Sequence, residues 1–270
     1  MSEIDVPETE VALRRRPDRR HGRRRSGWVV FLRDLVVILV IAFLVSFVLK
    51  TYLIRSFYIP SSSMENTLQI NDRIIVNELV PNAMPVQYGD VVVFRDPGGW
   101  LGYSAKAEQN WFLGAFDWLG SLVGLTASDS NDHLIKRVIG LPGDEVACCT
   151  PTGSLTVNGI PLDEPYLKIA EGQNAAPETF DVVVPPDSLW VMGDNRYNSK
   201  DSLGHIDDPG KGFVPLSTVV GKALVISWPI GRWSVLDNYP LTFAGVADAR
   251  ASTAVSGTVA ASAPDLQGAR

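Results

Sequence analysis

Hydrophobic residues form one long run near the N-terminus and many short runs after it. Residues 35–49, LVVILVIAFLVSFVL, are fifteen consecutive uncharged residues. A helix that starts at Trp28 and covers this run is about 33 Å long, enough for a bilayer core of roughly 30 Å. Arg33 and Asp34 then lie about one turn inside the boundary, where they can pair or reach the interface. The pattern predicts a membrane-spanning helix over residues 28–50.

Two other structures are compatible with a long apolar run. A core helix of a soluble domain usually keeps a polar face, and this run has none. A cleaved signal peptide also has a basic region before its apolar region, but the following residues, KTYLIRSFYIP, contain no small-x-small cleavage site. An uncleaved anchor fits best, and the other two structures stay open at this stage.

The charge distribution predicts how such a helix is oriented. The net charge is −6, yet residues 11–27 carry eight Arg against one acidic residue. A basic flank of this kind normally stays in the cytoplasm. We therefore expect a cytoplasmic arm over residues 1–27 and an extracytoplasmic domain in a single-pass protein of the cell membrane. Membrane lipid is the expected partner of the helix, and the arm is not expected to bind nucleic acid.

After the helix, the apolar runs shorten to the usual length of a β-strand. They are rich in β-branched residues and are separated by turn residues. The clearest runs are 73–79, 90–94, 134–140, 180–184, 189–192 and 219–228. Asn158-Gly159 lies between two further apolar runs, which is a strong signal for a hairpin. We expect a mostly β domain over residues 51–243.

Two segments depart from the strand pattern. Residues 99–131 form an expected insertion whose large apolar residues, Trp111 and Trp118 among them, either pack on the domain or lie on the membrane. Residues 244–270 are rich in Ala, Ser, Thr and Gly, and this composition predicts a disordered tail.

Composition limits the chemistry further. A chain of 270 residues that is 46% apolar can form a sizeable core and is too apolar to be wholly disordered. Its two Cys, Cys148 and Cys149, are adjacent and lack the spacing of a structural zinc site. We expect no metal and no cofactor, and the redox state of the two Cys stays open.

A serine run and a lysine are the first candidates for chemistry. Ser61, Ser62 and Ser63 follow a proline, where Ser most often forms a turn or a helix cap. A nucleophilic Ser needs a base in reach and donors for the oxyanion. Lys136 lies in an apolar run, on the same side of a strand as Leu134. A buried Lys has a lowered pKa and can act as a neutral base, whereas a Lys that reaches solvent stays charged.

A third polar cluster and a histidine complete the set. MGDNRYNSKDS, residues 192–202, follows a predicted strand and has the composition of an ordinary turn-rich loop. His205 offers an alternative base for a Ser-His-Asp triad. No Gly-x-Ser-x-Gly sequence supports that alternative.

Together these clusters resemble bacterial type I signal peptidases, which are membrane-anchored Ser/Lys proteases. The matching strings are PSSSM at 60–64, YGDVV at 88–92, KRVIGLPGD at 136–144 and MGDNR at 192–196. The resemblance covers roughly residues 52–230 and the apolar helix. It implies a signal peptidase-like fold of two antiparallel β-sheets after one transmembrane helix. It also implies removal of signal peptides from secretory preproteins after small-x-small sites.

The resemblance implies a role for each matching residue. Ser63 would be the nucleophile and Lys136 the general base. Ser61 would donate to the oxyanion together with the Ser63 amide, and Ser199 would orient Lys136. The implied pocket for small substrate residues consists of Phe57, Ile59, Pro60, Met64, Leu68 and Ile135. The implied supporting ion-pair network consists of Asp194, Arg196 and Asp201.

One position departs from the family pattern. The family often has Arg two residues after the position of Asp201, and this chain has Leu203 there. We therefore expect Arg196 to pair with Asp201 instead. Two alternatives also remain: a Ser/Lys peptidase dedicated to a few surface proteins, and a non-catalytic membrane-anchored β domain that binds peptides. The second alternative needs neither Ser63 nor Lys136.

Overall fold

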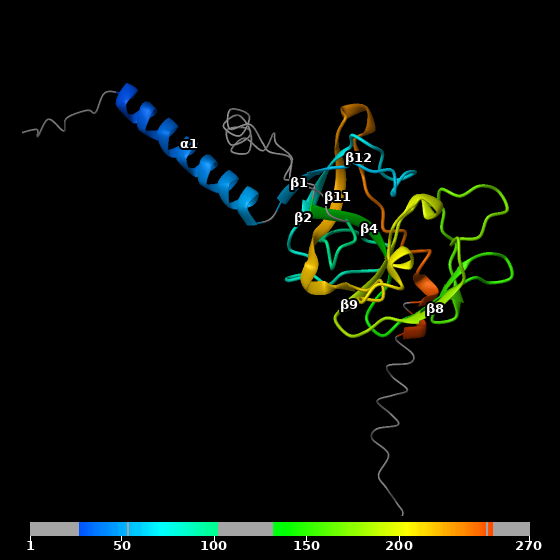
Figure 1. Ribbon diagram of the computed structural model, residues 1–270. Helices are drawn as coiled ribbons and strands as arrows, with labels where there is room; N and C mark the ends of the chain where they lie inside the picture. Colours follow the sequence, from blue (N-terminus) through cyan, green and yellow to red (C-terminus); the bar gives the residue numbers. More distant parts are fainter. Residues whose placement is uncertain (1–26, 53, 102–131, 247, 251–270) are drawn as a thin grey trace, which may run out of the picture. The chain divides into compact units, whose positions relative to one another are not determined.

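The computed structural model describes residues 27–52, 54–101, 132–246 and 248–250 (Figure 1). By its internal contacts the chain divides into two compact units, Met1–Ser46 and Phe47–Arg270. Of the insertion expected over 99–131, only the first three residues are among those described.

The N-terminal apolar run forms helix α1, Gly27–Tyr52. Its segment Gly27–Ser46 has a mean hydropathy of 2.7 and is long and apolar enough to cross a membrane. The two charged residues inside it pair with each other, since Arg33 Nη2 lies 2.8 Å from Asp34 Oδ1. Mutual pairing lowers the cost of placing these charges near the end of an apolar helix. The expected N-terminal apolar helix is confirmed, and its span across a membrane stays a prediction.

The second unit is built from short strands. They are β1 (Ile54–Tyr58), β2 (Arg73–Asn77), β3 (Val91–Arg95), β4 (His133–Gly140), β5 (Glu145–Cys148), β6 (Leu155–Val157), β7 (Ile160–Pro161), β8 (Phe180–Val183), β9 (Ser188–Met192), β10 (Val214–Pro215), β11 (Val219–Trp228) and β12 (Ser234–Val235). Short 3₁₀ turns follow β9, β10 and β11 at Arg196–Asn198, Leu203–His205, Leu216–Thr218 and Ile230–Arg232.

These strands form two antiparallel sheets, as expected from the resemblance. The larger sheet has the order β1-β2-β11-β3-β4-β9-β10, with β12 paired to β11, and the smaller has the order β7-β6-β5-β8. The predicted hairpin at Asn158-Gly159 joins β6 to β7, and both residues have positive φ, as the tight hairpin turn requires. The mostly β fold with two antiparallel sheets is confirmed.

The order of the large sheet brings the site segments together. β1 is an edge strand paired only with β2, and it leads into the serine run. Under it lies an apolar cluster that includes Phe57, Ile59, Met64 and Leu68. β4 lies between β3 and β9, but its pairing with β9 begins only at Arg137. The first four residues of β4 therefore keep one edge without a neighbouring strand among the described residues.

The predicted disordered tail begins too early. Residues 244–246 and 248–250 are helical, and Val246 is fully buried in the cluster around Trp190. Arg250 Nη2 also donates to the Pro142 carbonyl at 2.8 Å, and Nη1 lies 3.3 Å from Asp144 Oδ1. The prediction of disorder was wrong for these residues. It rested on the many small residues of the segment, whereas two other residues, Val246 and Arg250, make the contacts with the domain. Residues 251–270 lie outside the described part.

The two adjacent cysteines are paired, so Cys148 and Cys149 form a disulfide. Cys148 ends β5 and contributes to the core between the sheets.

Candidate active site

The serine run lies in a tight turn directly after β1. The turn is fixed on both sides, since Ile59 N donates to Asp72 O at 2.9 Å and Leu68 N donates to Met64 O at 2.8 Å. Ser63 is 8% exposed and faces inward, whereas Ser61 is exposed. The buried Met64 and Leu68 behind the turn hold it against the core. The sequence thus places one hydroxyl of the run in a buried position.

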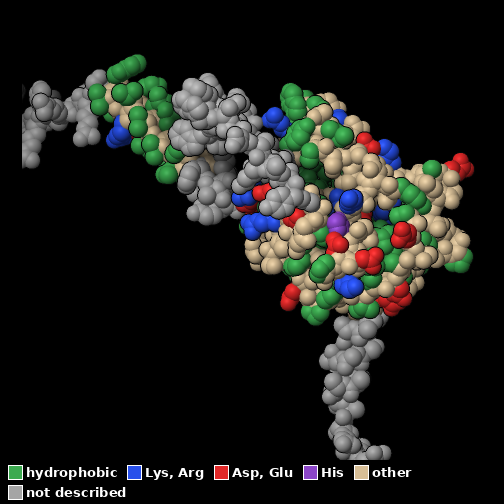
Figure 2. Space-filling view, in the orientation of Figure 1, with side chains coloured by type: hydrophobic (Ala, Val, Ile, Leu, Met, Phe, Trp, Pro, Cys, Tyr) green, Lys and Arg blue, Asp and Glu red, His purple; other side chains and the backbone are tan. Residues whose placement is uncertain are grey.

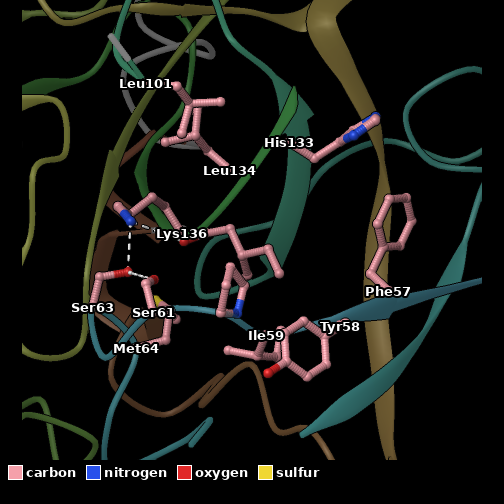
Figure 3. Close-up of a pocket in the computed structure, with 12 residues that line it drawn as sticks. Phe57, Tyr58, Ile59, Ser61, Ser63, Met64, Leu101, His133, Leu134 and Lys136 are labelled. Carbon is pink, nitrogen blue, oxygen red and sulfur yellow. Dashed lines mark hydrogen bonds between the residues drawn. The ribbon is translucent and has the colours of Figure 1, made fainter. Parts of the chain in front are cut away.

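The second group is supplied by β4. Lys136 pairs with Val92 of β3 in the sheet register, and its side chain turns to the side where the serine turn lies. Lys136 Nζ lies 2.8 Å from Ser63 Oγ and also donates to the Ile135 carbonyl at 3.1 Å (Figure 3). Only 3% of Lys136 is exposed. The expected approach of a lysine amine to the serine hydroxyl is therefore present in the structure.

Burial changes the acid–base behaviour of this amine. Loss of hydration lowers the pKa of Lys136 from 10.5 to about 8, against the opposing charges of Asp201 and Asp194, which raise it. A pKa near 8 leaves a substantial neutral fraction close to neutral pH. A neutral amine within hydrogen-bond distance of a serine hydroxyl can accept its proton, so this pair can generate a nucleophile.

Two asparagines of the 193–199 loop hold the serine turn in place. Asn195 donates from its backbone N to Ser63 O at 3.1 Å and from Nδ2 to Ser62 O at 3.1 Å. Asn198 Nδ2 donates to Ser62 Oγ at 2.8 Å. The sequence analysis assigned no role to these asparagines, because Asn in a turn-rich loop usually bonds its own backbone. The contacts show that the loop positions the turn that carries Ser63.

The two auxiliary serines differ in their environment. Ser61 Oγ lies 3.4 Å from Ser63 Oγ, close enough for its hydroxyl to face a group bound at Ser63. Ser199 Oγ is buried and makes no hydrogen bond within the described part of the chain. The expected contact from Ser199 to Lys136 is thus not formed in this structure. The orienting role of Ser199 stays a prediction.

The ion pairs under the site differ from the expected network. Arg137 binds Asp194 through two nitrogens, with Nε at 2.9 Å from Oδ1 and Nη2 at 2.8 Å from Oδ2. Arg196 pairs with Glu164, and both side chains are almost completely buried. Asp201 instead accepts from the backbone N of Gly193 at 2.8 Å and of Leu203 at 3.2 Å.

The predicted pairing of Arg196 with Asp201 is therefore wrong. Glu164 lies 32 residues before Arg196, and only the folded chain brings the two together. Arg137 was also missed as a member of the ion-pair network, because Lys136 was the residue of this strand that suggested chemistry. Strand alternation turns Arg137 to the opposite side, where its guanidinium lies 4.1 Å from the centre of the Tyr166 ring. The backbone N–H groups of Gly193 and Leu203, not an arginine, are the partners of Asp201.

A cavity of about 240 Å³ opens beside the serine and lysine side chains (Figure 3). Its lining residues are Phe57, Tyr58, Ile59, Pro60, Ser61, Ser63, Met64, Leu101, His133, Leu134, Ile135 and Lys136. Five of the six expected pocket residues are in this set. The exception is Leu68, which is fully buried in the core beneath the turn and does not reach the cavity.

The alternative histidine base lies elsewhere. His205 Nδ1 is 2.7 Å from Asp208 Oδ2, and its ring stacks on the Trp100 indole with centroids 4.3 Å apart. His205 does not line the cavity that contains Ser63. The geometry therefore disfavours a Ser-His-Asp triad and favours the Ser/Lys pair.

Comparison with known proteins identifies the family of this chain. The family described as "Signal peptidase, peptidase S26" matches residues 32–228. A signal peptidase I of Mycobacterium tuberculosis (strain H37Rv) is 42% identical over 228 residues, which cover 76% of this chain and 75% of the relative. A probable signal peptidase I of Mycobacterium leprae is 39% identical, with 75% of this chain and 78% of the relative covered.

Two further matches are more distant. A probable signal peptidase I-2 of Synechocystis is 34% identical over 84% of this chain and 86% of its own length. A solved signal peptidase I from Enterococcus faecalis aligns at 24% identity with a TM-score of 0.33, covering 51% of this chain and 95% of that chain.

A buried serine and lysine pair in a two-sheet β domain places the chain among the serine peptidases. Within that class, the match over residues 32–228 and the identities above 30% define it more closely. The chain belongs to the signal peptidase family, peptidase S26.

Proposed function

We propose that this protein is a membrane-bound endopeptidase that removes N-terminal signal peptides from translocated preproteins, with Ser63 as nucleophile and Lys136 as general base. The observation that carries the proposal is the 2.8 Å approach of a buried lysine amine to a buried serine hydroxyl inside an apolar cavity. Membership of the signal peptidase family supplies the substrate class.

The proposed reaction is acyl transfer in two stages. Neutral Lys136 takes the Ser63 proton as Ser63 Oγ attacks the peptide carbonyl, and the resulting ammonium returns a proton to the leaving amine. The Ser61 hydroxyl and the Ser63 amide stabilise the oxyanion, and each donor of this kind contributes on the order of 10²–10³ in rate. Water deprotonated by Lys136 then hydrolyses the acyl-enzyme.

Two strand edges that have no neighbouring strand within the described part of the chain suit an extended substrate. β1 is an edge strand, and residues 133–136 of β4 have β3 on one side only. A peptide that enters the cavity as a strand can hydrogen-bond to these edges while alternate side chains enter pockets. Ile59, Pro60 and Ile135 give the cavity part of its apolar lining. We expect this lining to accept Ala and to exclude large side chains at the first and third positions before the cut.

Membrane attachment places the enzyme where signal peptides end. We propose that α1 is the anchor, with its basic N-terminal flank in the cytoplasm and the β unit outside. The end of β11 and the loop to β12 carry exposed apolar side chains, among them Trp228, Ile230 and Trp233. Green side chains gather at this end of the unit in Figure 2. Aromatic and aliphatic groups of this kind suit contact with lipid.

The test is cleavage of preproteins by the full-length protein in detergent or vesicles. Ser63→Ala and Lys136→Ala should each lower cleavage by at least about 10³-fold, because removing either member of a nucleophile–base pair leaves only binding and oxyanion stabilisation. Ser217→Ala and Lys200→Ala, at exposed positions outside the cavity, are the matched controls and should cleave normally.

Other outcomes would identify the rival functions. Wild-type cleavage by Lys136→Ala would contradict the Ser/Lys mechanism. Binding of peptides without cleavage by the wild-type protein would support a non-catalytic peptide-binding domain. In cells depleted of the protein, accumulation of many precursors supports the general enzyme, and accumulation of a single precursor would support a dedicated one.

A further inference from the structure

The cavity has one wall that the family motifs do not supply. Leu101, at the start of the segment after β3, lines the cavity together with Leu134 of β4. In Figure 3 these two side chains lie together on one side of Lys136, while Ser63, Met64 and Ile59 lie on the other. Leu101 is 38% exposed, so its side chain is available to a bound molecule.

Four backbone hydrogen bonds to one carboxylate hold this wall in place. The Asp96 carboxylate caps the turn, because Oδ1 accepts from the backbone N of Gly98, Gly99 and Trp100 at 2.8–2.9 Å and Oδ2 accepts from Leu101 N at 3.2 Å. The hydrogen bonds from these backbone N–H groups lower the pKa of Asp96. The carboxylate therefore stays charged and keeps the cap over a wide pH range.

The residue before Leu101 fixes the turn to the domain. Trp100 is 8% exposed and packs edge-on against Phe94 of β3, with ring centroids 5.8 Å apart. Its other contact is the parallel stack on His205, at 4.3 Å. An anchored Trp100 and a capped backbone leave Leu101 little freedom, which makes it a preorganised contact for a ligand.

Strand alternation decides which substrate residue meets this wall. Ile135 packs against the cluster of Phe57, Ile59 and Met64, whereas Leu134 packs against the cluster that contains Trp100, on the opposite face of β4. A peptide strand beside β4 alternates in the same way. If its first and third residues before the cut point toward Ile135, the second residue points toward Leu134 and Leu101.

We infer that Leu101 is a specificity-determining residue that contacts the middle residue of the small-x-small sequence and favours a large apolar side chain there. The inference rests on the proposed function. It extends that function to the middle substrate position, which the small-x-small preference leaves unrestricted. Asp96 is a positioning residue for this contact.

The experiment measures kcat/KM of the full-length protein for peptides that differ only in the middle residue, which is Ala, Leu, Phe or Glu. Wild-type protein should prefer Leu and Phe over Ala. Leu101→Ala should lower kcat/KM for Leu and Phe by roughly five- to tenfold, because it removes apolar contact, and leave Ala within about twofold. Leu101→Lys should reverse the preference in favour of Glu.

Two further variants separate this contact from a general structural effect. Asp96→Ala should move the Leu-to-Ala ratio in the same direction as Leu101→Ala, since loss of the cap frees the turn. Leu241→Ala removes a leucine that is 90% exposed and lies outside the cavity, and should leave the ratio unchanged.

Different outcomes overturn the role of Leu101 and the proposed function. Equal losses for every middle residue, or an unchanged ratio in Leu101→Ala, would overturn the role of Leu101 while leaving the proposed function intact. A wild-type protein that cleaves none of the peptides and no preprotein would overturn the proposed function, and the role of Leu101 with it.

Discussion

Lys136 Nζ lies 2.8 Å from Ser63 Oγ, although the two residues are 73 positions apart in the chain, Lys136 in β4 and Ser63 in the turn after β1. Neither side chain is accessible to bulk water to any large extent. A charged amine in such a place lacks most of its hydration, so the neutral form is favoured. The same burial that activates the base also makes the site costly to fold, and both effects are measurable.

The pH dependence of cleavage follows from the lysine. Because burial lowers the pKa of Lys136 to about 8, and the neutral form is the active base, log kcat/KM should rise about one unit per pH unit below 8 and level off above it. A pH–rate profile with a peptide that has no titrating group checks this. A rising limb centred near pH 6.5 would indicate a histidine base instead.

The charge of Asp201 should move this profile. The carboxylate raises the pKa of Lys136, so Asp201→Asn should lower the pKa and shift the rising limb toward lower pH. The amide oxygen can still accept one of the two backbone N–H bonds that Asp201 receives. Asp187→Asn is the matched control at an exposed position, and its profile should overlay that of the wild type.

Lys136 should also reduce the stability of the fold. A shift of its pKa from 10.5 to about 8 corresponds to on the order of 3 kcal/mol of cost for the protonated state. We therefore expect Lys136→Met to be inactive but more stable at pH 7, by about 1–3 kcal/mol in unfolding free energy. Thermal unfolding in detergent at several pH values gives this difference.

The sign of its pH dependence is fixed by linkage. The unfolded lysine binds a proton up to about pH 10.5 and the folded one only up to about pH 8, so the wild type gains stability as the pH rises between these values. The advantage of Lys136→Met should therefore be largest below pH 8 and shrink above it. An advantage that stays constant from pH 7 to 10 would contradict the lowered pKa.

The buried pair of Arg137 and Asp194 should contribute mainly to folding. Both side chains are fully buried and joined by two hydrogen bonds. Asp194→Ala leaves an unpaired guanidinium in the core and should cost about 3–5 kcal/mol of unfolding free energy. Lys168→Ala breaks a half-exposed pair with Glu65 and should cost less than about 1 kcal/mol. Chemical denaturation of the variants compares the two, and equal losses would contradict the difference in burial.

The fold was predictable because its signals are local, whereas the proposed nucleophile and base were expected from the resemblance to family motifs. Apolar run length indicated the helix, alternation indicated the strands, and two short strings contained Ser63 and Lys136. The partners under the site were not predictable in the same way. Asp194 and Glu164 are both acidic and both near the site, and only the packed structure decides which arginine reaches which carboxylate. Asn195 was missed for the same reason.

Gly193 packs closely beneath Ser63, the proposed nucleophile, and leaves no space there for a side chain. A Cβ at Gly193 would lie 2.5 Å from the Ser63 carbonyl oxygen and 2.3 Å from Ser199 Oγ, distances that real Cβ atoms do not adopt. Gly193→Ala therefore has to push the serine turn or the 193–199 loop aside. A displacement of about 1 Å at a reacting group can cost on the order of 10²-fold in rate. We expect kcat to fall by that factor, with Lys136 and Ser63 both still present.

Gly204→Ala is the matched control for this effect. Its Cβ would meet no atom closer than 3.9 Å, and Gly204 has a negative φ that alanine accepts. Steady-state kinetics on both variants, with thermal unfolding to confirm that each is folded, separates displacement of the nucleophile from loss of structure. If Gly193→Ala folded and cleaved at the wild-type rate, close packing of the loop against Ser63 would not be required for catalysis.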